Sequence, residues 1–395
     1  MSNEVNNFKF EGGLKKITLS LILLCLVGFA MSFMQNKIIG WTDYLVFSLY
    51  FTTIAVSSLF MLALGGVVQA SWFTPYKRIL EAMSSFLPVA ALLMGGTLLS
   101  LHTLYEWTHK DVVAKDPILS KKVAWLNEPR YIGTMVLIFA IWIILGAIFR
   151  RYSDKMNSAT SGIEATKKHV GFSAVAMILF ALSISFASFD WIMSLEPHWF
   201  STIFGVYIFA GSFQSGMAFI TLAVITLKGW GYFKNINENH YHDFGKWMFG
   251  FSVFWAYIWI SQYLLIWYAN IPEETEYYVL RHHHWNTQFF FNLCINFIVP
   301  FFVLMTREAK RNAKVLKTVA CLILVGHFLD LYIMVAPKVF EHNSISGVTG
   351  FGILQLIELV GGFGLFIFVI AKALSKRDLE VVNDPTYDEG IHLHQ

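Results

Sequence analysis

Ten long apolar stretches, separated by short polar gaps, constrain this chain more than any other feature of its sequence. Each has about 20 residues, the length that an α-helix needs to cross a bilayer core of about 30 Å. Only 14% of the residues are charged and 56% are hydrophobic, whereas a soluble domain has about 25% charged residues. We therefore predict an all-α polytopic membrane protein with ten transmembrane helices, at residues 14–33, 44–70, 82–105, 131–149, 170–189, 201–227, 244–269, 285–305, 315–335 and 350–371.

Lysine and arginine residues gather in alternate gaps between these stretches. The chain has 29 of them, and 21 lie in the N-terminal segment, the even-numbered gaps and the C-terminal segment. Cytoplasmic loops of membrane proteins carry an excess of Lys and Arg. We therefore expect both termini in the cytoplasm, with a tail of residues 1–13 before the membrane domain of residues 14–374 and a charged tail of residues 375–395 after it.

The sequence contains no recognisable binding pattern for a metal or a haem. The three cysteines lie far apart in expected helices, without the CxxC or CxxCH spacing of iron–sulfur and c-type haem sites. Of 13 histidines, only His102 and His327 fall clearly inside expected helices, which is a weak basis for haem b. The three histidines at 282–284 favour a headgroup or protein contact over a metal, because consecutive helical residues point in different directions. We expect no covalently bound cofactor and no metal site.

Polar residues inside the expected helices fall mainly in the outer half of the membrane. His327 and Asp330 are three residues apart on the ninth helix, so they share a face, and Glu358 lies on the tenth. His102 and Glu106 close the third helix and Asp190 closes the fifth. A charge at the bilayer centre costs roughly 3 kcal/mol, so such groups need interior partners or water. The pattern indicates a polar vestibule on the outer side; the alternative is that each acid is neutral or paired and only joins helices.

Two outer loops contain the most specific sequences in the chain. One is DWIMSLEPHWFST at 190–202, and the other is LIWYANIPEETEYY at 265–278. Their aromatic residues suit the membrane interface. Their acids and prolines predict a defined lid that receives a partner protein.

Both loop sequences resemble the integral membrane subunits of bacterial alternative complex III, a respiratory quinol:cytochrome c oxidoreductase. These subunits belong to the polysulfide-reductase membrane-subunit (NrfD-like) family. The resemblance covers nearly the whole chain. The length, the ten helices and the sequence WYANIPEET are closer to the smaller of the two related subunits in that complex.

The resemblance implies two four-helix bundles, here residues 44–190 and 201–336, with the first and tenth helices outside them. It also implies a complex in the bacterial inner membrane that passes electrons from menaquinol through an iron–sulfur subunit to multihaem c-type cytochromes. Haem and iron–sulfur clusters would lie only in those partner subunits. A homologous ten-helix membrane subunit and lipids would be further partners, and nucleic acid is not expected.

Within such a complex, we expect this chain to contribute to proton conduction and assembly more than to direct quinol oxidation. His327, Asp330 and Glu358 are the predicted proton path. His102, Glu106 and Asp190 are the predicted site of a menaquinone-related pocket or of a second proton path. An ion-coupled secondary transporter, which needs broken helices near the midplane, and a purely structural anchor remain as alternatives.

Overall fold

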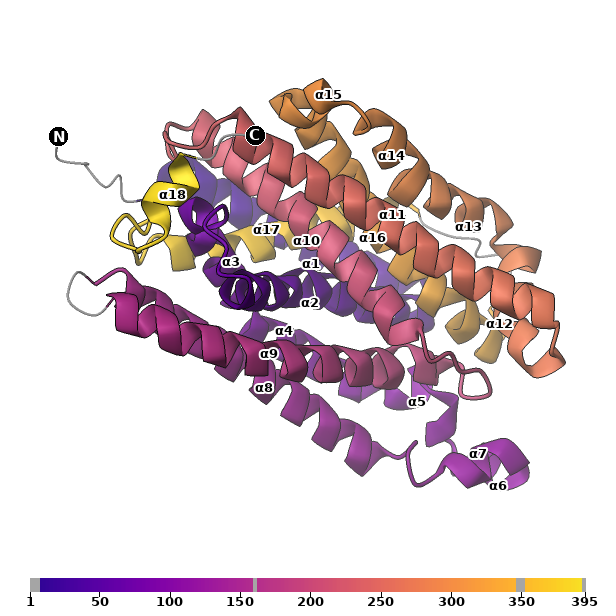
Figure 1. The fold of residues 1–395 in the computed structure, drawn as a ribbon. Helices are drawn as coiled ribbons and strands as arrows, with labels where there is room; N and C mark the ends of the chain where they lie inside the picture. Colours follow the sequence, from indigo (N-terminus) through magenta and orange to yellow (C-terminus); the bar gives the residue numbers. More distant parts are fainter. Residues whose placement is uncertain (1–7, 159–161, 346–351, 393–395) are drawn as a thin grey trace.

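The computed structural model describes residues 8–158, 162–345 and 352–392, which contain helices and no strand (Figure 1). Ten helical segments in these residues are long and apolar enough to cross a membrane, which confirms the prediction of an all-α multi-pass membrane protein. The eight unbroken spans are α1 (Gly12–Gln35), α2 (Lys37–Val67), α8 (Glu128–Met156), α9 (Gly162–Trp191), α10 (Phe204–Gly229), α11 (Glu238–Ala269), α16 (Ala313–His342) and α17 (Ile353–Leu374).

The third and eighth spans are broken into shorter pieces, each near a proline. A proline inside a helix removes a backbone N–H donor, and Pro88 and Pro300 stand within the first two residues of α4 and α14. The third span consists of η1 (Thr74–Tyr76), α3 (Lys77–Ser84), α4 (Leu87–Gly96), η2 (Thr97–Ser100) and α5 (Leu101–Leu104). The eighth consists of α13 (Asn286–Leu293), the π-helical turn η5 (Cys294–Ile298) and α14 (Val299–Val303).

Short helices lie at the two ends of the membrane domain. We call the end that carries α18 the terminal end, and the opposite end the cap end. In Figure 1 the cap end carries α6, α7 and α12, and the terminal end carries α18. The cap end comprises η3 (Glu106–Thr108), α6 (Lys110–Lys115), α7 (Pro117–Lys122), η4 (Met193–Leu195) and α12 (Pro272–His284); the terminal end comprises α15 (Arg307–Arg311) and α18 (Tyr387–Ile391).

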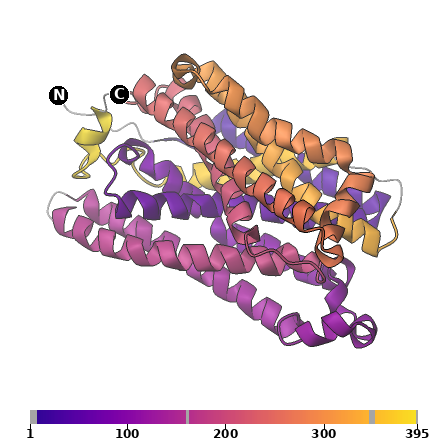
Figure 2. The same cartoon turned by 45° about the vertical axis from the view of Figure 1, so that its right-hand side comes forward.

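Three helices form the centre of the molecule. In the most apolar 18 residues of α2, 94% of the residues are buried, and the share is 83% in both α10 and α16. The corresponding share is 39% in α8 and 33% in the span that contains α9. The helices α8 and α9 pack against each other, with α9 also on α2, whereas α11 packs on α10, which itself packs on α16. Figure 2 shows α8 and α9 along one flank and the segments from α11 to α15 along the other. We call α2 to α9 the first bundle and α10 to α16 the second bundle, following the expected division at residues 44–190 and 201–336, which stays a prediction.

The helices α1 and α17 pack along each other outside these bundles. A Cβ atom on Gly361 would lie 2.6 Å from the backbone nitrogen of Cys25, and one on Gly364 would lie 2.4 Å from Cβ of Leu21. Small residues allow such close approach of two membrane helices. The opposite face of α1 presents exposed apolar side chains such as Leu23 and Leu26, which lipid can solvate.

The segment of residues 375–392 is a packed strap across the terminal end, although the sequence suggested a tail. Asp384 pairs with Lys77 of α3 at 3.3 Å. The hydroxyl of Tyr387 accepts from Asn235 at 3.2 Å, and the carbonyl of Gly390 contacts Nε2 of His240 at 3.0 Å. The strap therefore joins the third span to the α10–α11 loop and to α11. The remaining residues of the expected tails, 1–7 and 393–395, lie outside the described residues.

The ninth helix is longer than its apolar run. We expected it at 315–335, and α16 spans Ala313–His342 with Pro337 inside it. The tenth begins at Ile353, and the expected start at position 350 lies outside the described residues. At 1.5 Å per residue, Asp330 lies about 18 Å from the cap end of α16 and Glu358 about 8 Å from that of α17.

Candidate functional site

Three buried carboxyls inside the membrane domain have only neutral hydrogen-bond partners among the described residues. Asp330, Glu358 and Asp43 are at most 2% exposed. Their hydrogen-bond partners are tyrosine, tryptophan, serine and amide side chains. A carboxyl with such partners can take up or release a proton without breaking an ion pair. These three groups are therefore the candidate proton-binding groups of the membrane domain.

Asp330 of α16 points into the interior of the second bundle. Its Oδ1 accepts from the hydroxyl of Tyr207 at 2.5 Å and from Nδ2 of Asn292 at 2.6 Å. Its Oδ2 accepts from Nε1 of Trp255 at 3.0 Å. The four residues come from α10, α11, α13 and α16, so each helix of this bundle supplies one. We call this group the Asp330 cluster.

A row of amide groups continues from the Asp330 cluster to the break in the eighth span. Asn296 donates to Oδ1 of Asn292 at 2.6 Å. Because Pro300 has no N–H, the carbonyl of Asn296 loses its usual helical partner four residues on. Gln214 of α10 donates to that carbonyl at 2.8 Å and to Ser252 at 2.8 Å. The polar groups inside this bundle therefore form hydrogen bonds to one another.

His327 lies on α16 one turn before Asp330 but faces a different helix. Its Nε2 lies 2.9 Å from the hydroxyl of Thr53 on α2. Its Nδ1 is buried and has no hydrogen-bond partner among the described residues. A Cβ on Gly211 of α10 would lie 3.1 Å from this nitrogen. His327 therefore occupies the contact between the two bundles.

Glu358 shares its surroundings with a second acid, Asp43, at the cap-end half of α1, α2 and α17. Oε1 of Glu358 accepts from Ser32 of α1 at 2.7 Å. Oδ2 of Asp43 accepts from Nε2 of Gln355 at 2.9 Å. The phenol group of Tyr332 on α16 interacts electrostatically with both carboxyls. We call Asp43 and Glu358 the carboxyl pair.

Two like charges in one buried site repel each other, so a pair of this kind binds and releases protons as a unit. The three residues of the expected proton path thus lie in three separate contacts. Asp330 bonds inside the second bundle, His327 bonds to α2, and Glu358 bonds to α1. The helix α16 stands between the Asp330 cluster and the carboxyl pair, and Tyr332 lies two residues from Asp330 on its other side.

Asp43 was missed in the sequence because it stands one residue before the apolar run at 44–70. The observed α2 begins at Lys37, so Asp43 is already inside the helix. The signal that was available is its position. Asp43 lies near the start of α2, as Glu358 lies near the start of α17.

The second predicted group, His102, Glu106 and Asp190, does not form one site. Asp190 is fully buried and forms an ion pair with Arg130 of α8. It also accepts from Thr134 at 2.8 Å. His102 is exposed and lies 3.7 Å from Glu128. Asp190 therefore joins α8 to α9, while His102 belongs to the surface.

A groove of about 970 Å³ lies beside His102 at the cap end. It is lined by side chains of the segment from η3 to α7 and of the start of α8, including His109 and Glu128. Glu106 is partly buried and interacts electrostatically with His342. Neither Glu106 nor Asp190 lines this groove, so a shared pocket of all three predicted residues is absent there.

The two loop segments at 190–202 and 265–278, which we expected on the outer side, are fastened to each other. Arg281 of α12 is fully buried and donates to Glu196 at 2.8 Å. Its guanidinium lies 3.4 Å from the ring centre of Tyr277, which stacks on Trp199 at 4.1 Å. Burial raises the pKa of the Glu196 carboxyl, and Arg281 opposes this rise. We expected the side chains of Glu196 and Trp199 to contact a partner protein. In the structure Glu196 pairs with Arg281 and Trp199 stacks on Tyr277 of the same chain.

Arg281 also donates hydrogen bonds to backbone carbonyls of α16. Pro337 has no N–H for the carbonyl of Ile333 four residues earlier. Nε of Arg281 donates to that carbonyl at 3.0 Å, and Nη2 donates to the carbonyl of Met334 at 2.9 Å. In the sequence Arg281 is one of the eight Lys and Arg residues outside the basic gaps, and its role as a donor to the carbonyls of α16 was not predicted.

In the described part of the chain, no group of three or more His, Cys, Asp or Glu side chains is arranged to hold a metal ion. The run at 282–284 spreads around the end of α12: His282 contacts Asn286 at 2.9 Å, and the rings of His283 and His284 are 6.3 Å apart.

No protein-family model matches the chain, and no curated protein matches it either.

Proposed function

We propose that this chain is an integral membrane subunit of a respiratory quinol:cytochrome c oxidoreductase of the alternative complex III type, in a bacterial inner membrane. In that complex it conducts protons and supports assembly. Menaquinol is oxidised with partner subunits that carry the iron–sulfur clusters and c-type haems. The loop sequences that resemble this family support the proposal, and the buried carboxyls support the proton role.

The observation that carries the proton role is the burial of Asp330, Asp43 and Glu358 with neutral partners. Ionised groups inside a membrane are costly, and those that occur commonly mark proton or ion pathways. The Asp330 cluster and the carboxyl pair lie on opposite sides of α16. We assign them as two proton-holding stations, with His327 at the contact between the bundles.

A secondary transporter is the alternative, and the broken spans bear on it. Transporters leave freed backbone groups of broken helices to coordinate substrate or ion near the midplane. Here the freed carbonyl of Asn296 is bonded to Gln214, so protein fills the place that an ion would take. This contact favours the subunit over the transporter.

The first experiment is isolation from the native membrane in a mild detergent. The subunit proposal expects co-purification with chains that show haem absorbance. A chain that purifies alone and catalyses substrate uptake in vesicles would support the transporter instead.

The second experiment tests the two stations. Asp330→Asn and Glu358→Gln keep the side-chain size and remove the titrating group, so we expect normal complex yield and less proton release per quinol oxidised. Glu341→Gln is the control, because Glu341 is an exposed acid on the same helix as Asp330. Normal yield with normal proton release would exclude both residues from the mechanism, and loss of assembly alone would favour the structural anchor.

A further inference from the structure

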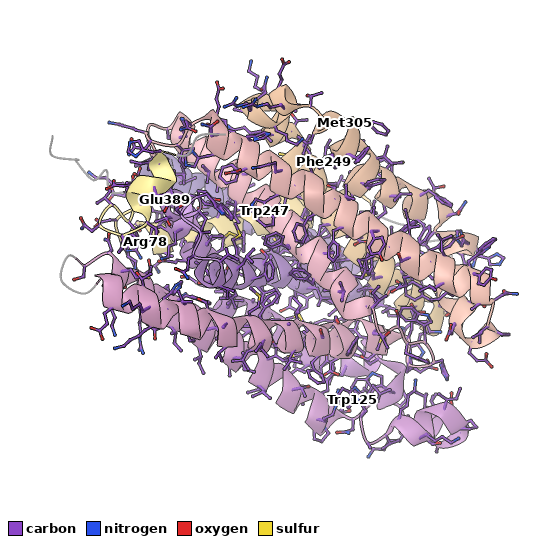
Figure 3. All side chains as sticks on the ribbon, viewed as in Figure 1. Arg78, Trp125, Trp247, Phe249, Met305 and Glu389 are labelled. Carbon is purple, nitrogen blue, oxygen red and sulfur yellow. The ribbon has the colours of Figure 1, made fainter. Side chains whose placement is uncertain are left out.

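A basic pocket of about 320 Å³ lies at the terminal end, between α3, α8, α17 and the start of the strap. Five cationic side chains line it. Figure 3 labels one of them, Arg78, at the end of the molecule that carries α18. The five are Arg78, Arg150, Lys372, Lys376 and Arg377.

The carboxylates in and beside this pocket neutralise only part of its charge. Arg78 pairs with Glu81 at 2.7 Å and with Asp154 at 3.0 Å. Arg377 pairs with the same two acids at 3.5 and 3.1 Å. Asp378 is the other acid in the lining. Five cations thus face three carboxylates, which leaves an excess of positive charge.

The excess is concentrated on groups whose hydrogen-bonding capacity is not filled. Arg150 donates to the hydroxyl of Ser84 at 2.7 Å and forms no ion pair with a described residue within 4.0 Å. Lys372 and Lys376 are exposed. Nε of Arg78, a residue only 5% exposed, has no hydrogen-bond partner in the described part of the chain. These donors are available to an anion.

The pocket lies near the ends of two helices that are long and apolar enough to cross a membrane. Arg150 lies six residues before the end of α8, and Lys372 lies two residues before the end of α17. The remaining lining includes the apolar side chains of Ala82, Val369 and Ala373. A ligand here meets cations at one end and apolar helix surface at the other. This polarity matches a lipid more closely than a small soluble anion.

We propose that the basic pocket binds a phosphate group, supplied by the headgroup of an anionic phospholipid. The guanidinium of Arg150 and the ammonium groups of Lys372 and Lys376 donate to the phosphate oxygens. Basic pockets between membrane helices are a known place for anionic headgroups, and charged donors form the strongest hydrogen bonds to phosphate. The bound lipid would fasten α17 and the strap to α3 and α8.

The test uses the purified full-length chain with whatever subunits co-purify. Thermal stability is measured on titration with dioleoyl phosphatidylglycerol, dioleoyl phosphatidylcholine or inorganic phosphate in the same detergent. We expect a saturable rise in Tm with phosphatidylglycerol. Arg150→Gln should weaken its apparent affinity about fivefold, since each cation near an anionic surface contributes roughly that factor.

Arg151→Gln is the matched control, because Arg151 is exposed on the same helix and does not line the pocket. If Arg150→Gln fails to fold, the exposed pair Lys372→Gln and Lys376→Gln provides the same measurement. An equal rise with inorganic phosphate would assign the site to a soluble anion and overturn the lipid source. An affinity for phosphatidylglycerol that is unchanged in the pocket variants, or equally reduced in Arg151→Gln, would overturn the site.

Discussion

Replacing Arg281 by methionine should be among the most damaging single changes in this chain. The guanidinium donates to Glu196 and to the backbone carbonyls of Tyr277, Ile333 and Met334, at 2.7 to 3.0 Å. Removing one partner of a buried ion pair costs about 3–5 kcal/mol, because the other charge is left unpaired. We expect a loss of folding free energy of that size in Arg281→Met, measured by reversible denaturation in detergent.

The double variant Arg281→Met with Glu196→Leu separates the orphaned charge from the other contacts. It removes the carboxylate and leaves only the unsatisfied carbonyls, each of which costs about 1–3 kcal/mol. The double variant should therefore be more stable than Arg281→Met alone. Lys314→Met, the loss of an exposed cation, is the control and should change stability little. A double variant that is as unstable as the single one, or less stable, would refute this account of the ion pair.

The same pair predicts a pH dependence. Burial already raises the pKa of Glu196, and Arg281 limits the rise, so Arg281→Met should raise it further. A carboxyl with a raised pKa in the folded state binds protons more tightly when folded, so its stability contribution is present at low pH and is lost as the pH rises through the folded pKa. The destabilisation by Arg281→Met should thus be smaller at pH 5 than at pH 8. A deficit that is the same at both values would show that the unpaired carboxylate is not its cause.

Three further outcomes are expected. In intact spheroplasts, a membrane-impermeant label should react with a cysteine at Thr275 and not with one at Asn312, because the basic loops are expected to be cytoplasmic; the reverse pattern would invert the topology. Hydrogen bonds from the backbone of Leu119 and from His198 lower the pKa of Asp116. Protection of the α7 amides from hydrogen exchange should therefore be retained above the ordinary carboxyl pKa and lost as the pH falls through the lowered pKa of Asp116. The variant Asp116→Asn should abolish this pH dependence. Gln214→Leu leaves the carbonyl of Asn296 unpaired and should cost about 1–3 kcal/mol in denaturation experiments, whereas an unchanged stability would show that the carbonyl finds another donor.

The sequence was sufficient for the number and type of the membrane spans, because a bilayer sets their length and composition. It was less informative about where the helices end. The apolar run ends near Val335, yet α16 continues to His342, since Pro337 is tolerated once Arg281 supplies the missing donor. The strap at 375–392 has the composition of a solvated tail, and only its tertiary partners, such as Lys77 for Asp384, hold it in place.

The site was predicted less well than the fold, because helical spacing gives the face of a residue and not its partner. His327 and Asp330 do lie on neighbouring parts of α16, as their spacing indicates. Their hydrogen bonds nevertheless go to different helices, to Thr53 of α2 and to Tyr207 of α10. Asp190 was grouped with His102 by depth and by the family resemblance, and neither shows that Arg130 is its partner. Partners across helices depend on the packing of the whole bundle.

The buried polar side chains fall into two classes: those that donate to a backbone carbonyl freed by a proline, and those that do not. Lipid offers no hydrogen bonds, so a carbonyl freed by proline inside the membrane needs a donor from the protein. Gln214 serves the carbonyl freed by Pro300, and Arg281 serves the one freed by Pro337. These two buried side chains therefore have a structural role that requires no function. The carboxyls of Asp330, Asp43 and Glu358 are acceptors and cannot fill such a role when ionised. Among the described residues they donate to no backbone carbonyl and pair with no cation, so their burial supports the proposed proton role.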